Sequence, residues 1–116
     1  MAGVAFQCES IQEAEVICNA VNRYGRVVLR AEGVDLRNYA PANSEGAGFG
    51  WDAVQRAARD MGKGTITHMS VRMAEAIRLA LESRAENGAN YDRADTAAQL
   101  ATRMSACIRH AQQKGK

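Results

Sequence analysis

Residues 10–25, SIQEAEVICNAVNRYG, carry the clearest structural signal in the chain. Ser10 is followed three residues later by Glu13, a capping box in which the serine accepts one backbone N–H and the glutamate reaches back to another. Gly25 ends helices readily, because glycine adopts a left-handed backbone at little cost. Apolar residues recur between them at the spacing of one helix face, at Ile11, Ala14, Ile17, Cys18 and Val21. The stretch therefore predicts a helix over residues 11–24.

The segments on either side of this helix are typical of short strands. Residues 4–8, VAFQC, form a short apolar run, and residues 26–31, RVVLRA, contain β-branched side chains that favour extended backbone. Alternation along the second segment places Arg26 and Arg30 on the same face. A turn at Gly33 leads to a candidate third strand over residues 34–36. We therefore expect a strand–helix–strand start.

The rest of the chain is predicted to be helical, apart from an irregular loop over residues 37–50. Apolar spacing predicts three helices, over residues 51–61, 67–86 and 93–112. The last two are joined by a short turn, which predicts a helical hairpin. The expected fold is a single domain over residues 1–116 of the α+β class and helix-rich. It has a small sheet of two or three strands with a β-α-β start, followed by three helices.

Composition excludes several classes of protein. A chain of 116 residues fits one domain. Its formal net charge of +2 is too small for the basic footprint of a strong nucleic-acid binder. No stretch approaches the roughly 20 apolar residues of a membrane span, and the first residues do not resemble a secretory signal. We therefore expect a cytoplasmic protein with no membrane partner.

Residues that usually carry chemistry do not form a recognisable set. Cys8, Cys18 and Cys107 have neither zinc nor redox spacing. His68 and His110 lie in no metal or hydrolase motif. We assign no catalytic residue, no metal ligand and no cofactor, and the sequence favours a non-enzymatic role.

Three aromatic residues, Tyr39, Phe49 and Trp51, lie in or beside the irregular loop. Aromatic side chains on exposed loops are common anchors for protein partners. The first hypothesis is a small regulator or inhibitor that binds a protein partner through these residues and a helical face. Proteins of this size class are common among phage and mobile-element accessory proteins.

Two alternatives use other residues. Arg23, Arg26 and Arg30 cluster around the predicted second strand and are suited to contacts with nucleic-acid phosphates. Gly46, Gly48 and Gly50 precede a predicted helix, where backbone N–H groups can hold a phosphate or nucleotide ligand. Asp52 in the first turn of that helix would repel such an anion.

Residues 65–71, TITHMSV, and the two helices predicted after them resemble a ribbon-helix-helix DNA-binding domain over residues 65–112. That family pairs one strand with its twofold mate and inserts alternate polar side chains into the major groove. In a strand over these residues, Ile66 and His68 would point to the same face, so polar side chains do not alternate cleanly with apolar ones. A separate αβ half also precedes the segment. We therefore carry no residue roles over from that family.

Bulky apolar residues are scarce in this chain. Ile, Leu, Val and Phe together make up twenty residues, whereas alanine occurs 22 times. Alanine buries little area, which limits what a monomer gains from its core. We therefore expect a homodimer or higher oligomer, assembled through Met69, Met73 and Met104 on the helical hairpin.

Overall fold

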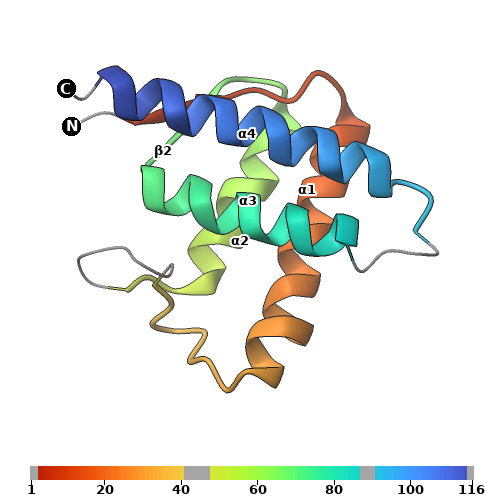
Figure 1. The fold of residues 1–116 in the computed structure, drawn as a ribbon, viewed down its shortest axis with the longest axis vertical. Coiled ribbons are helices and arrows are strands. Elements are labelled where there is room, and N and C mark those ends of the chain that lie inside the picture. The colour runs from red at the N-terminus through yellow and green to blue at the C-terminus, as the bar shows by residue number, and fades with distance from the viewer. Residues whose placement is uncertain (1–2, 41–47, 87–90, 115–116) are drawn as a thin grey trace.

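The computed structural model describes residues 3–40, 48–86 and 91–114, which form two helical layers (Figure 1). The hairpin of α3 (Val71–Glu86) and α4 (Ala94–Lys114) lies across α1 (Ile11–Arg23) and α2 (Trp51–Asp60). A sheet of β1 (Val4–Phe6) and β2 (Thr67–Met69) packs beside α4. The expected α+β, helix-rich class is confirmed.

The cap predicted at the start of α1 is present, although the glutamate reaches back to the residue before Ser10 and not to Ser10 itself. The Glu13 N–H donates to Ser10 Oγ at 3.2 Å, and the Glu13 carboxylate accepts the Glu9 N–H at 2.9 Å. Extended backbone at Ser10 makes this geometry possible. The local sequence alone therefore fixes where the helix begins.

The predicted end of this helix and the strand after it are wrong. Beyond α1 the chain stays helical through a wider π-helical turn, η1 (Tyr24–Leu29), and on to residue 31. The helix ends at Gly33, whose φ is +75°. There the Val34 N–H donates to the Leu29 carbonyl and the Gly33 N–H to the Arg30 carbonyl, the bonds of a Schellman motif. The left-handed glycine that stops the helix is therefore Gly33 and not Gly25.

The sheet has two strands, but its second strand comes from a different part of the chain. β2 runs antiparallel to β1, with Val4 opposite Met69 and Phe6 opposite Thr67. Residues 26–31 are helical and residues 34–36 form no strand, so the expected β-α-β start is wrong. The helix predicted over 67–86 begins at Val71, because residues 67–69 pair with β1. The ribbon-helix-helix family pairs its strand with a second copy, whereas β2 pairs within this chain.

The core lies between the two helical layers and contains many small residues. Its buried side chains include nine alanines, and six of them lie on α3 and α4, namely Ala74, Ala76, Ala80, Ala97, Ala101 and Ala111. Small residues let the two helices of the hairpin approach closely. Met104 is fully buried in this core, and Met69 and Met73 pack against it. Met104 therefore offers no surface to a second copy, whereas Met69 and Met73 are only partly buried and an interface through these two stays a prediction.

Arg103 of α4 connects the second layer to the start of α1. Its Nη1 donates to both carboxylate oxygens of Glu13 at 2.9 Å, and its Nη2 donates to the Gln7 carbonyl at 2.9 Å. The guanidinium also lies over the Phe6 ring of β1, 5.1 Å from its centroid. One side chain therefore holds β1, the cap of α1 and α4 together.

This contact predicts a pH dependence of stability. Burial works to raise the pKa of Glu13, but the Glu9 N–H and the Arg103 guanidinium outweigh it, so the pKa lies below its ordinary value. The carboxylate therefore stabilises the fold at pH above its unfolded-state pKa, and this stability is lost as the pH falls through the folded-state pKa. We expect Glu13→Gln to cost about 1 kcal/mol near neutral pH. Urea unfolding between about pH 7 and about pH 3 should show a shallower pH dependence for the variant than for the wild type.

Glu86→Gln is the matched control, because Glu86 lies exposed at the end of α3 and the change is chemically the same. It should follow the wild-type curve. If Glu13→Gln lost stability on acidification as steeply as the wild type, the Arg103 contact would not be the source of the effect.

Candidate functional site

The aromatic residues predicted to bind a partner form a buried cluster. Trp51 is 2% exposed and Tyr39 is 5% exposed. The Tyr24 ring stacks on Trp51 at 5.7 Å between centroids, and the Tyr39 ring meets Trp51 edge-on at 5.0 Å. Phe49 is half-buried, and its backbone pairs with that of Tyr39 through two hydrogen bonds of 2.8 Å. Tyr39 and Trp51 therefore offer no surface to a partner, and their aromatic cluster closes the ends of the loop.

Trp51 also determines the shape of the helix that it touches. Its indole N–H donates to the Val21 carbonyl at 3.0 Å. Its ring lies so close to Gly25 that a Cβ there would be 2.6 Å from the indole. The carbonyl lies in the last turns of α1 and the glycine lies in η1. Gly25 is therefore required for the close approach of the Trp51 ring. The sequence predicted it as a helix stop and did not indicate this contact.

The glycine loop also has a packing role. Gly46 lies outside the described residues. A side chain at Gly48 would collide with Asn38, and one at Gly50 would collide with the Asp52 carboxylate. That carboxylate lies at the start of α2, the place a bound phosphate would take. The described part of the loop therefore argues against an anion site.

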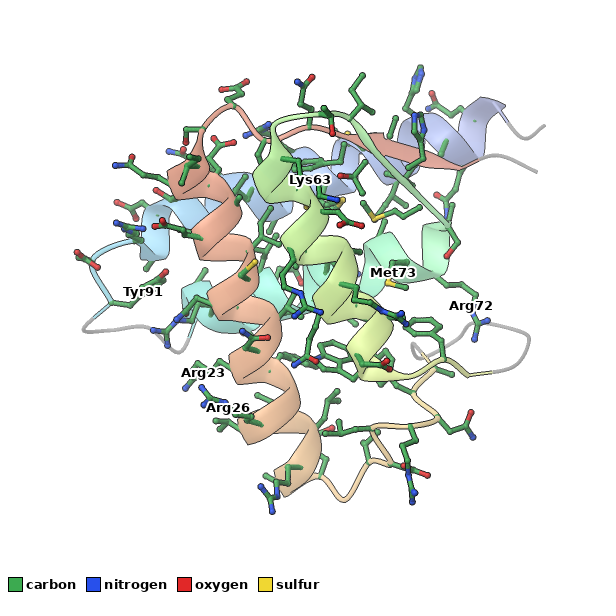
Figure 2. The ribbon with its side chains drawn as sticks, turned by 180° about the vertical axis from the view of Figure 1, so that it is seen from behind. Arg23, Arg26, Lys63, Arg72, Met73 and Tyr91 are labelled. Atoms are coloured by element: carbon green, nitrogen blue, oxygen red, sulfur yellow. The ribbon has the colours of Figure 1, made fainter. Side chains whose placement is uncertain are left out.

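The three arginines of the alternative hypothesis do share a face, although on a helix. They are spaced three and four residues apart, which brings them to one side of the helix formed by α1 and η1. Figure 2 shows Arg23 and Arg26 projecting from the same side of this helix, away from α2. Arg26 and Arg30 are exposed, and no carboxylate among the described residues forms an ion pair with any of the three.

Val27 lies among these arginines with 49% of its surface exposed. An exposed branched apolar side chain inside a cluster of cations can supply contact area to a bound partner. In the strand that the sequence predicted over residues 26–31, alternation would have turned Val27 away from Arg26 and Arg30. We refer to Arg23, Arg26, Val27 and Arg30 together as the basic face.

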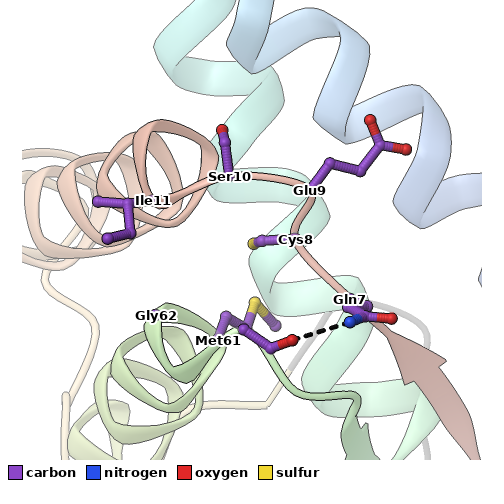
Figure 3. A pocket seen from close by; sticks show the side chains of 8 residues that line it. Gln7, Cys8, Glu9, Ser10, Ile11, Met61 and Gly62 are labelled. Atoms are coloured by element: carbon purple, nitrogen blue, oxygen red, sulfur yellow. Dashed lines mark hydrogen bonds between the residues drawn. The ribbon is translucent and has the colours of Figure 1, made fainter.

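A cleft of about 520 Å³ lies at the other end of α1, where the chain leaves β1 and passes the end of α2 (Figure 3). Gln7 closes one side by donating to the Gly64 carbonyl at 2.8 Å. Cys8 lines the cleft, and burial raises the pKa of its thiol to about 11, so the thiol stays protonated near neutral pH. A protonated thiol is a poor nucleophile. The cleft joins segments 57 residues apart, and no local sequence pattern signals it.

No protein-family model, curated protein or solved structure matches this chain. Among the residues that the structure describes, no group of three or more His, Cys, Asp or Glu side chains is placed to hold a metal ion. No helix within the described ranges is long and apolar enough to cross a bilayer. The choice of a functional surface therefore depends on geometry and charge.

The close approach of Trp51 predicts the effect of adding one methyl group. We expect Gly25→Ala to destabilise the protein, because overpacking against a rigid ring costs about 1–3 kcal/mol. The better helix propensity of alanine returns at most about 1 kcal/mol. Chemical denaturation followed by Trp51 fluorescence should give a lower midpoint than for the wild type.

Gly62→Ala is the control, because a Cβ at Gly62 would meet nothing closer than the Ala14 methyl at 3.9 Å. That variant should unfold at the wild-type midpoint or above it. A Gly25→Ala midpoint equal to or above the wild type would show that the ring does not pack on Gly25 in solution.

Proposed function

We propose that this chain is a non-enzymatic binding module of the cytoplasm, a regulator or inhibitor that acts on a protein partner through the basic face. The observation that carries the proposal is the grouping of Arg23, Arg26 and Arg30 around the exposed Val27, with no ion pair to any carboxylate in the described part of the chain. Arginine donates in a planar fork that matches carboxylates, so the face is complementary to an acidic protein surface.

Several arginines elsewhere in the structure have carboxylate partners within the chain. Arg56 contacts Asp52, Arg78 contacts Glu82, and Arg103 contacts Glu13. Internal ion pairs of this kind leave less charge for an outside partner. The basic face differs because it brings three arginines to one side of a helix, and none of them forms an ion pair with the residues that the structure describes.

The basic face favours an acidic protein over a nucleic acid. Val27 gives the face an apolar centre, and protein interfaces combine an apolar centre with a polar rim. Nucleic-acid interfaces are more strongly positive, and this chain carries 13 acidic residues against 15 basic ones. Nucleic acid is therefore the second candidate, supported by the arginines alone.

The test compares capture of partners by three forms of the chain. Wild type, Arg23→Glu/Arg30→Glu and Arg109→Glu are immobilised and exposed to nuclease-treated extract of the native cell. We expect the double variant to lose the captured protein, because it places two carboxylates against an acidic surface. Arg109 lies exposed on α4, so Arg109→Glu reverses one charge away from the basic face and should retain capture.

The captured protein is then purified and its binding measured directly at increasing salt. Binding that survives nuclease treatment and weakens moderately with salt supports the proposal. If capture is lost after nuclease treatment and the chain binds a DNA or RNA duplex with a steep salt dependence, the partner of the basic face is a nucleic acid and the proposal is wrong. Equal capture by the wild type and the double variant would refute a role of the basic face.

A further inference from the structure

A stripe of exposed residues runs along the whole outer side of α1 and η1. It comprises six residues, all exposed, namely Ile11, Glu15, Asn19, Asn22, Arg26 and Arg30. They are separated by four, four, three, four and four positions, which keeps them on one side of a helix. The opposite side of α1 packs into the core through its buried residues. Figure 2 shows α1 in the layer nearest the viewer, with no other ribbon in front of it.

The spacing of this stripe is the same in both directions along the helix, and the one mirrored pair in which both residues are charged, Glu15 and Arg26, carries opposite charges. Two such helices placed antiparallel around a twofold axis bring Glu15 opposite Arg26 and Ile11 opposite Arg30. Asn19 and Asn22 then meet at the axis. Each contact occurs twice, as an isologous interface requires. The surface is therefore complementary to itself.

We propose that this stripe is an interface between two copies of the chain, with α1 packed antiparallel against α1 of the second copy. Antiparallel helices place the positive N-terminal end of each helix dipole beside the negative end of the other. Ile11, which is 68% exposed, covers the aliphatic stem of the partner copy's arginine. Glu15 and Arg26 form two ion pairs related by the twofold axis.

Neighbouring side chains hold the stripe in place without covering it. Arg93, which directly precedes α4, donates to Glu15 at 3.2 Å, and the Glu15 side chain remains 60% exposed. Gln55 of α2 donates to the Asn22 side chain at 3.2 Å. These contacts reduce the side-chain freedom that would be lost on association. The stripe is mostly polar, so the dimer is weak, reversible and sensitive to salt.

This inference goes beyond the proposed function, because the stripe pairs with itself whatever other partner exists. The two surfaces overlap at Arg26 and Arg30. Self-association and binding of an acidic partner therefore compete for the same guanidinium groups. Dilution of the chain frees the basic face.

The experiment measures molar mass by sedimentation equilibrium at low salt, from a few micromolar to several hundred micromolar. We expect the wild type to move from monomer to dimer over that range. Arg26→Glu places a carboxylate opposite Glu15 of the other copy in both symmetry-related contacts. Glu15→Arg places a cation opposite Arg26 of the other copy in the same two contacts. Each variant alone should associate at least about tenfold more weakly, equal to about 1.4 kcal/mol.

An equimolar mixture of Arg26→Glu and Glu15→Arg is the decisive sample. In the mixed pair, each altered residue faces an opposite charge, so the mixture should recover association that neither variant shows alone. Arg109→Glu is the control and should associate like the wild type, because Arg109 lies on α4 outside the stripe. Circular dichroism verifies that each variant is folded.

A wild type that stays monomeric at several hundred micromolar would overturn the inference. Unchanged association of Arg26→Glu, or a mixture that stays monomeric, would also overturn it. Failure here is separate from failure of the proposed function. A monomer that still captures a partner through Arg23 and Arg30 would leave the proposed function intact, whereas a dimer that captures nothing would leave only this inference standing.

Discussion

The contact between Trp51 and Gly25 is the constraint on which the remaining structure depends. The indole lies close against a backbone with no Cβ, and its N–H donates to the Val21 carbonyl one turn earlier. A ring that sits this close and takes a backbone acceptor accompanies a local widening of the helix into the π-helical turn η1. The same residue starts α2, where its backbone N–H donates to the Leu36 carbonyl at 2.7 Å. One residue therefore joins the end of the first helix, the ends of the loop and the start of the second helix.

Local signals in the sequence predicted those parts of the fold that local interactions determine. The cap at Ser10 and Glu13 and the amphipathic helices all form close to where their spacing places them. Residues 26–31 failed because Val27 and Val28 prefer extended backbone when considered alone, while burial of Leu29 and the Trp51 contact favour a helix. The helix stop predicted at Gly25 lies at Gly33 for the same reason. Gly25 serves a contact with a residue 26 positions away, and Gly33 ends the helix.

In the candidate site, too, the sequence predicted what depends on local spacing and missed what depends on contacts between distant residues. Arg23, Arg26 and Arg30 are three and four positions apart, which brings them to one side of a helix. They therefore lie together although the strand predicted for residues 26–31 was wrong. Tyr39 and Trp51 failed as surface anchors because they are buried against each other and, for Trp51, against Tyr24 of η1, which is distant in sequence. Charge along that helix is also divided. The acidic start is largely neutralised by Arg93 and Arg103, and the basic end has no such partner among the described residues.

The central claim is that residues 11–31 form one helix, continued past Gly25 by its contact with Trp51. The most direct test is the set of backbone ¹³Cα chemical shifts of residues 24–31 measured by NMR. The account predicts helical shifts without a break from Ile11 to Ala31, ending at Gly33. Extended-type shifts over residues 26–31, as the local sequence alone would produce, would contradict it.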